Sequence, residues 1–198
     1  MKVLKQQVQL FILVLSILLL TSQTFGALKP GDLIFLKMPC YVCSLIEKTT
    51  NSPFSHVGIL DRDASGAWVV IMAIEPKVMA VSLQYLLSRI NSQPVYMRMK
   101  SVNGQILAIK AVQNARRFIG TPYDSEFKLG ISELYCSELV FYSFMNANNG
   151  NPVFLLRPMT FKPFTSEWTS VLRHPPPEGL LGISPGDLAR SIYLQRVN

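Results

Sequence analysis

Three strand-type segments lie in the first half of the chain and are separated by turn residues. They are 31–37 (GDLIFLK), 54–63 (FSHVGILDRD) and 66–76 (GAWVVIMAIEP). The sequence DASG at 63–66 predicts a tight hairpin between the last two segments. Because strands joined by a tight turn run antiparallel, this part of the chain is expected to form an antiparallel sheet.

The rest of the chain predicts helices that cover this sheet. Helical apolar spacing occurs at 81–90, 104–120 and 136–147, whereas 94–101 and 190–197 have strand character. From residue 148 onward, prolines and turn residues predominate until the closing strand. The expected fold class is therefore α+β, with an antiparallel sheet packed against about three helices.

The first 26 residues predict a secretory signal peptide. Lys2 and Lys5 form a basic start, the stretch 10–20 is apolar apart from Ser16, and 21–27 is small and polar. The apolar stretch is shorter than the roughly 20 residues that a bilayer span needs. We expect cleavage near residues 26–27, a single mature domain of 27–198, and export to a periplasm or the medium. An uncleaved N-terminal anchor is the alternative.

The charge of the chain favours an anionic partner surface but not nucleic acid. The formal net charge is +7, and removal of Lys2 and Lys5 leaves +5. Such a balance favours a loose association with an anionic cell envelope. The Lys and Arg residues are scattered, without a basic run or interleaved aromatic residues, so the sequence does not predict nucleic-acid binding.

The chain has three cysteines, and two of them form a C-x-x-C pair. Cys40 and Cys43 are compatible with a local disulfide, with two inert loop residues, with a redox pair or with half of a zinc site. The zinc interpretation needs two more ligands, and only two histidines, His56 and His174, are available. Cys136 is the cysteine left over.

Cys136 stands at the predicted start of the helix 136–147. Unpaired N–H groups and the helix dipole favour an anion at this position, so we expect a lowered pKa and a nucleophilic thiolate. His56 is the candidate base, because His174 lies in the proline-rich sequence RHPPPEG and is expected to be exposed on the surface. Gly58 is expected to leave open space beside His56. The alternative for Cys136 is a buried small apolar residue.

Three further residues are candidates for the same site. Glu75 is at the end of the strand that follows the His56 strand. In the expected hairpin it lies opposite residues near 53–55, where its carboxylate could orient the imidazole of His56. Tyr123 and Tyr135 could line a substrate cleft, although packing or surface positions would explain them equally well. Asp32, in the sequence GDLIF, is expected to stabilise a turn rather than to act in catalysis.

The ordered motifs GDLIF, FSHVGIL, AIEP, FIGTPYD and LYCSELVFYSF resemble the permuted papain-like cysteine hydrolases. This is the YiiX-like branch of the NlpC-like superfamily, which is related to the lecithin–retinol acyltransferase-like proteins. The resemblance spans about residues 30–144 and implies a circularly permuted papain-like core. It implies Cys136 as nucleophile, His56 as base and Glu75 as third polar residue, with no cofactor and no metal. In this chain Pro76 follows Glu75, where the family pattern has a small residue.

The resemblance implies an exported cysteine amidohydrolase that forms a thioester intermediate. Its substrate would be a peptide amide of the cell wall or the amide of a lipid conjugate. A lipid acyltransferase or esterase that uses the same Cys–His site is the alternative enzyme. A non-catalytic binding module is a further alternative, which the presence of both Cys136 and His56 disfavours.

Overall fold

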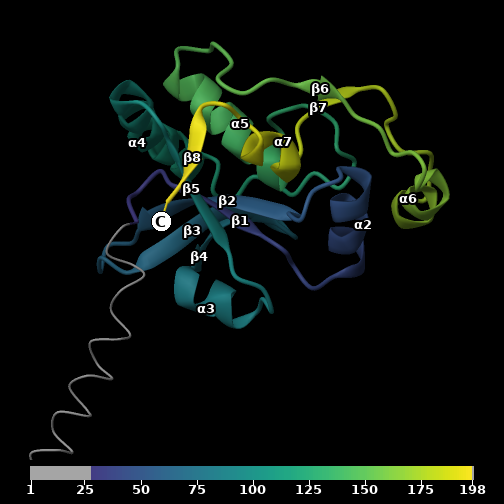
Figure 1. Cartoon of the computed structure of the whole chain (residues 1–198), viewed down its shortest axis with the longest axis horizontal. Helices are drawn as coiled ribbons and strands as arrows, with labels where there is room; N and C mark the ends of the chain where they lie inside the picture. The colour runs from purple at the N-terminus through teal and green to yellow at the C-terminus, as the bar shows by residue number, and fades with distance from the viewer. Residues whose placement is uncertain (1–27, 198) are drawn as a thin grey trace, which may run out of the picture.

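The structure is a computed structural model that describes residues 28–197; the predicted signal peptide lies outside the described residues. A six-stranded antiparallel sheet forms the centre of the molecule, with helices on both faces (Figure 1). This arrangement confirms the predicted α+β class. In spatial order the strands are β4 (Lys77–Ser82), β3 (Trp68–Ile74), β2 (His56–Arg62), β1 (Leu33–Leu36), β5 (Val95–Met99) and β8 (Leu194–Arg196).

The described part of the chain contains the three helices predicted from helical apolar spacing, in the expected order, and three further ones. Helices α3, α4 and α5 correspond to the three predicted segments, and α5 has the predicted bounds. Within residues 28–197, no helix combines the length and the apolar character that crossing a membrane requires. The helices are α2 (Tyr41–Thr49), α3 (Leu83–Ser88), α4 (Val102–Arg117), α5 (Cys136–Ala147), α6 (Thr165–Leu172) and α7 (Pro185–Ala189).

The predicted β2–β3 hairpin is confirmed, and a second hairpin follows it. Asp63 accepts hydrogen bonds from the N–H groups of Ser65 and Ala67 and so closes the first turn. β3 ends before Pro76, as expected from the missing N–H of proline. The chain then reverses at once into β4, which the sequence analysis did not predict. The pairing Ile74–Lys77 shows how tight this second reversal is.

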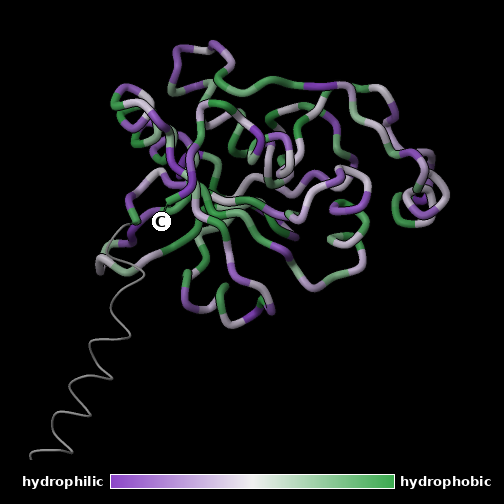
Figure 2. Tube along the Cα trace, in the orientation of Figure 1, coloured by the Kyte–Doolittle hydropathy of each residue, from purple (hydrophilic) through white to green (hydrophobic). Residues whose placement is uncertain are grey.

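Two apolar layers sandwich the sheet, because alternate side chains of each strand point to opposite faces. Leu33 and Phe35 of β1 pack with α4 and α5 on one face, whereas Ile34 and Leu36 pack toward α3 on the other. Since both faces are covered, the central strands are apolar at nearly every position (Figure 2). The face toward α5 is the one that holds the cysteine.

A long excursion between α5 and α7 covers the end of the sheet near α2 (Figure 1). It contains α6 and a small two-stranded antiparallel sheet of β6 (Arg157–Pro158) and β7 (Leu181–Gly182). The buried Trp168 of α6 donates a hydrogen bond from Nε1 to Oγ1 of Thr49, at 2.8 Å. This contact attaches the excursion to α2.

Candidate active site

Cys136 is the first residue of α5, in agreement with the predicted helix start. Tyr135 is the N-cap residue and has an extended backbone. The apolar side of α5 packs against β2 and β3 and holds the N-terminus of the helix at the sheet. Cys136 is only 4% exposed, and it is the one cysteine of residues 28–197 that is not in a disulfide. The cysteine therefore lies in the interior at the end of the helix that contacts β2.

Burial dominates the acidity of the Cys136 thiol. The backbone N–H groups of Val57 and Ser137 interact with the thiol and lower its pKa, as the helix start predicts. Desolvation of the thiolate is the larger effect and raises the pKa of Cys136 to about 11. The expectation of a lowered pKa is therefore wrong, and the resting side chain is a neutral thiol at pH 7.

The contact with Val57 brings the cysteine next to the histidine strand. The pairing of β2 with β3 runs from Arg62–Trp68 to Ile59–Ile71 and ends before Val57. The backbone of Val57 therefore lies beyond the last residue pair of this ladder, where its N–H is near the thiol of Cys136. Two segments that are some eighty residues apart in the sequence meet at this point.

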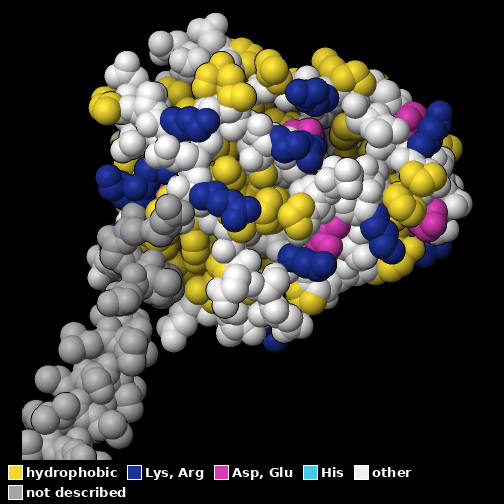
Figure 3. All heavy atoms as spheres, in the orientation of Figure 1, with side chains coloured by type: hydrophobic (Ala, Val, Ile, Leu, Met, Phe, Trp, Pro, Cys, Tyr) yellow, Lys and Arg dark blue, Asp and Glu magenta, His cyan; other side chains and the backbone are white. Residues whose placement is uncertain are grey.

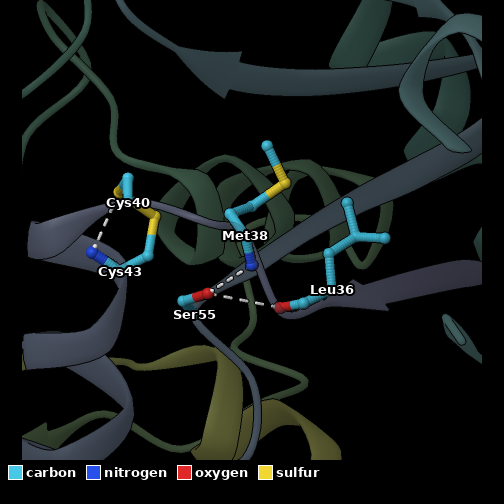
Figure 4. The surroundings of a disulfide bond; sticks show 5 residues. All are labelled: Leu36, Met38, Cys40, Cys43 and Ser55. Atoms are coloured by element: carbon cyan, nitrogen blue, oxygen red, sulfur yellow. Dashed lines mark hydrogen bonds between the residues drawn. A yellow bond between two sulfur atoms is a disulfide. The ribbon is translucent and has the colours of Figure 1, made fainter. Parts of the chain in front are cut away.

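His56 is the first residue of β2 and is buried. Its neighbour Ser55 accepts a hydrogen bond from the N–H of Met38 at 2.9 Å and donates one to the carbonyl of Leu36 (Figure 4). These bonds fix the start of β2 against the end of β1. Nε2 of His56 is buried and has no hydrogen-bond partner within residues 28–197.

The environment of His56 keeps the imidazole neutral. Desolvation lowers the pKa of His56 to about 4, because burial disfavours the imidazolium. A neutral imidazole with an unpartnered Nε2 can accept a proton. No hydrogen bond joins His56 to Cys136 in the part of the chain that the structure describes. Cys136, at the start of α5, lies near the backbone of Val57, the residue after His56 in β2. The thiol and the imidazole do not form an ion pair at rest.

Gly58 does not leave the open space that was expected beside His56. A Cβ atom at this position would overlap Cγ1 of Val70 and lie 3.2 Å from Cβ of Met72. The glycine is needed because side chains of β3 pack across β2 at this point. The open space next to His56 is instead a cavity that Gly58 does not line.

Glu75 lies in the turn between β3 and β4 and is exposed. If the pairing Ile59–Ile71 is continued residue by residue, Glu75 falls opposite Ser55, in agreement with the level predicted from the sequence. Glu75 and His56 line the same cavity. Glu75 forms no hydrogen bond with His56 among residues 28–197.

Two cavities meet beside Tyr123. One has a volume of about 230 Å³ and is lined by Cys136, and the other has a volume of about 600 Å³ and is lined by His56 and Glu75. Burial raises the pKa of Tyr123, so its hydroxyl stays protonated. Three residues line both cavities: Ile46, Tyr123 and Phe127.

The backbone around Tyr123 joins the two sides of the site. Its N–H donates to the carbonyl of Pro76 at 3.0 Å, in the turn that carries Glu75. The N–H of Leu134, two residues before Cys136, donates to the carbonyl of Pro122 at 2.9 Å. Tyr123 is therefore held between the β3–β4 turn and the start of α5.

Tyr135 lines the cavity on the Cys136 side. The hydroxyl of this buried tyrosine accepts a hydrogen bond from the N–H of Ile183 at 3.2 Å, and its ring packs edge-on against Phe127. These contacts fix the ring as part of the wall. Burial raises the pKa of Tyr135, so this hydroxyl is neutral as well.

The C-x-x-C pair forms a disulfide at the start of α2 (Figure 4). Both cysteines line the cavity on the His56 side. Sulfurs joined in a disulfide are not available as thiolate ligands, which contradicts the zinc interpretation.

Asp32 accepts a hydrogen bond from the N–H of Lys29 and binds Arg98 at 2.7 Å, in agreement with its predicted role in the turn.

Glu138 is a buried carboxyl that the sequence analysis missed. It accepts hydrogen bonds from the N–H groups of Gly130 at 2.8 Å and Tyr135 at 3.3 Å. These bonds fasten the preceding loop to the helix start that carries Cys136. Its position three residues after the N-cap residue is the sequence signal for such a role. Burial raises the pKa of Glu138 to about 8.

We expect Glu138→Gln to remove one contribution to the pH dependence of folding stability between about pH 4.5 and 8. The folded wild type binds more protons than the unfolded chain in this range, because the pKa of Glu138 is raised. The contribution of Glu138 to the free energy of unfolding therefore falls as pH rises, by on the order of 2–4 kcal/mol, and it is read as the difference between wild type and Glu138→Gln at each pH. Urea unfolding at several pH values measures this slope, and the exposed Glu133→Gln is the control. An unchanged slope in Glu138→Gln contradicts the assignment.

Similar proteins support the fold. The protein YiiX of Escherichia coli K12, whose curated name calls it uncharacterized, is 26% identical over 136 residues, 69% of this chain and 67% of that protein. A crystal structure titled metalloprotein YiiX, from Escherichia coli O157:H7, has a TM-score of 0.75 at 23% identity and covers 86% of this chain and 96% of that one. Residues 28–197 of this chain hold no group of three or more His, Cys, Asp or Glu side chains suited to a metal ion.

The family is shown by a match over nearly the whole chain. Residues 27–198 match the family described as permuted papain-like amidase enzyme, YaeF/YiiX, C92 family. This match agrees with the motifs around His56 and Cys136 and supports a cysteine hydrolase-like activity. The chain belongs to the permuted papain-like amidase family YaeF/YiiX.

Proposed function

We propose that this chain is an exported cysteine amidohydrolase in which Cys136 is the nucleophile and His56 is the general base. The observation that carries the proposal is the meeting of the α5 N-terminus with the start of β2. There the N–H of Val57, the residue after His56, lies close enough to the thiol of Cys136 to favour its charged form. Nε2 of His56 has no hydrogen-bond partner among the described residues, so it is free to accept a proton. Export follows from the signal-peptide pattern of residues 1–26.

The pKa values of the two groups favour proton transfer during attack rather than before it. A thiol with a pKa near 11 and an imidazole with a pKa near 4 form no stable ion pair at rest. As sulfur attacks the amide carbon, its proton moves to Nε2 of His56. The N–H groups of Val57 and Ser137, which favour negative charge at this position, can donate hydrogen bonds to the developing oxyanion.

The second half of the reaction returns the enzyme to its resting state. The imidazolium gives its proton to the leaving amine, and the thioester remains on Cys136. Water then attacks the thioester while His56 accepts its proton, and the thiol is regenerated when that proton is returned. Glu75, on the cavity that His56 lines, is the residue that would stabilise the imidazolium.

The cavity on the Cys136 side favours acyl transfer as the second candidate function. Its walls are largely aromatic and aliphatic, which disfavours water at the thioester. Transfer of the acyl group to an alcohol or amine would then compete with hydrolysis. The apolar wall residues are Ile46, Phe127, Tyr135, Met159, Phe161, Trp168 and Ile183.

The test uses cell-wall peptide fragments and N-acyl or O-acyl lipids in separate incubations. Mass spectrometry follows the release of amine and acid, and an added amine or alcohol acceptor reveals acyl transfer. Wild type is expected to process one substrate set, whereas Cys136→Ala leaves both unchanged. If both proteins process the substrate equally, or if neither processes either set, the amidohydrolase proposal fails.

A further inference from the structure

Helix α4 has a second apolar stripe that does not contact the core. Val102, Ile106 and Ile109 are 74%, 55% and 46% exposed. Their spacing of four and three residues places them on one side of the helix. The opposite side is buried in the core through Ala111 and Ala115. An apolar stripe that the fold does not bury is typical of an interaction surface.

The stripe continues onto the loop before β8. Ile192 and Tyr193 are exposed, and the carbonyl of Tyr193 accepts a hydrogen bond from the N–H of Lys100, immediately before α4. We call Val102, Ile106, Ile109, Ile192 and Tyr193 the α4 face. α4 and β8 lie on the side of Figure 1 where the described chain begins.

The charges around the α4 face are positive. Lys29, Lys100 and Lys110 are exposed. Helix α4 and the segment 190–197 contain no Asp or Glu. Asp32, which lines the same groove as Lys29 and Ile106, is buried and bound to Arg98 at 2.7 Å. Basic side chains also predominate over acidic ones across the view in Figure 3.

The start of the described chain lies at the same place. Lys29 lines a groove of about 250 Å³ together with Val102, Ile106 and Ile109. In the sequence, the apolar stretch 10–20 precedes this point by about ten residues. In the alternative in which residues 1–26 stay as an uncleaved anchor, the chain would leave the membrane beside the α4 face.

We propose that the α4 face docks on the surface of an anionic lipid bilayer. Its aliphatic side chains enter the boundary between headgroups and acyl chains, and the lysines bind lipid phosphates, as in interfacial amphipathic helices. A second copy of this chain is disfavoured as the occupant, because it would bring two rims of lysines together. The proposal is independent of the catalytic assignment, since it uses none of the site residues.

The test places a fluorescent label on the α4 face of the full chain. Ile106→Cys supplies an exposed thiol, whereas Cys136 is buried and Cys40–Cys43 is a disulfide. The matched control is Leu180→Cys, since Leu180 is 51% exposed on the remote excursion. With phosphatidylglycerol vesicles that contain brominated lipids, we expect quenching of the label at 106 and not at 180. Equal quenching at both positions, or none at 106, overturns the proposal.

Charge variants test the role of the lysines. We expect Lys100→Gln and Lys110→Gln each to lower partition of the full chain into anionic vesicles by about fivefold. Lys162→Gln, on the excursion, should have no such effect. Neutral vesicles should not distinguish these variants. Equal partition of all variants into anionic vesicles contradicts docking on lipid. So does a label at position 106 that becomes shielded from solvent in oligomers of this chain when no vesicles are present.

Discussion

Cys136→Ala is expected to reduce turnover by roughly 10⁴-fold or more while the fold remains intact. No other described side chain supplies a thiol, and removal of a nucleophile abolishes the covalent route. Alanine is preferred to serine because an unpaired hydroxyl in this buried position would add a desolvation cost. Steady-state rates on the substrate identified by mass spectrometry measure the loss, and circular dichroism with urea unfolding tests the fold.

The matched control removes the other two cysteines. In Cys40→Ser/Cys43→Ser, turnover should stay near the wild-type rate, because sulfurs joined in a disulfide supply no thiol for the reaction. Stability should fall by no more than about 2 kcal/mol, since the disulfide closes a very short loop. If the double variant loses turnover and Cys136→Ala retains it, the redox interpretation replaces the hydrolase.

His56→Gln is expected to lower kcat/KM by about 10²–10⁴-fold, the usual contribution of a general base. In wild type, kcat/KM should fall with acid near pH 4 rather than near pH 6.5, because burial lowers the pKa of His56. Below that pH the imidazolium cannot accept the thiol proton. The pH profile of kcat/KM in both proteins measures this limb, which should be absent from His56→Gln.

Folding stability provides a second check on His56. The unfolded chain binds a proton on this histidine below about pH 6.5, whereas the folded chain does so only near pH 4. The contribution of His56 to the free energy of unfolding should therefore fall by about 3 kcal/mol as pH falls through this window, read as the difference between wild type and His56→Gln. His56→Gln should lack that loss. The activities of wild type and His56→Gln are compared only at pH values where both proteins are folded. If kcat/KM of His56→Gln still falls near pH 4, His56 is not the general base.

Much of the local structure could be predicted from the sequence. The alternation of 31–37 and 54–63 predicted β1 and β2, and the apolar spacing of 136–147 predicted α5 with its exact bounds. The ordered motifs predicted the family. These signals are local, since strand and helix periodicities depend on neighbouring residues. The strand β4 was missed because its pattern merges with the following helix.

The character of the site depends on contacts that no local pattern contains. The helix start predicted a lowered pKa for Cys136, but packing of α5 against the sheet buries the thiol and raises its pKa. Gly58 suggested open space, whereas Val70 of the neighbouring strand fills it. Glu138 is recognisable as a capping residue, but its burial follows from the loop that closes over it.

The sequence by itself determined strands β1, β2, β3, β5 and β8, the cysteine helix, and the presence of Cys136 and His56 as the candidate nucleophile and base. Only the tertiary structure decided that the thiol of Cys136 meets the backbone beside His56, and that both groups are neutral at rest. The physical reason is that desolvation depends on which segments pack together across long distances in the chain. Secondary structure, in contrast, depends on residues a few positions apart.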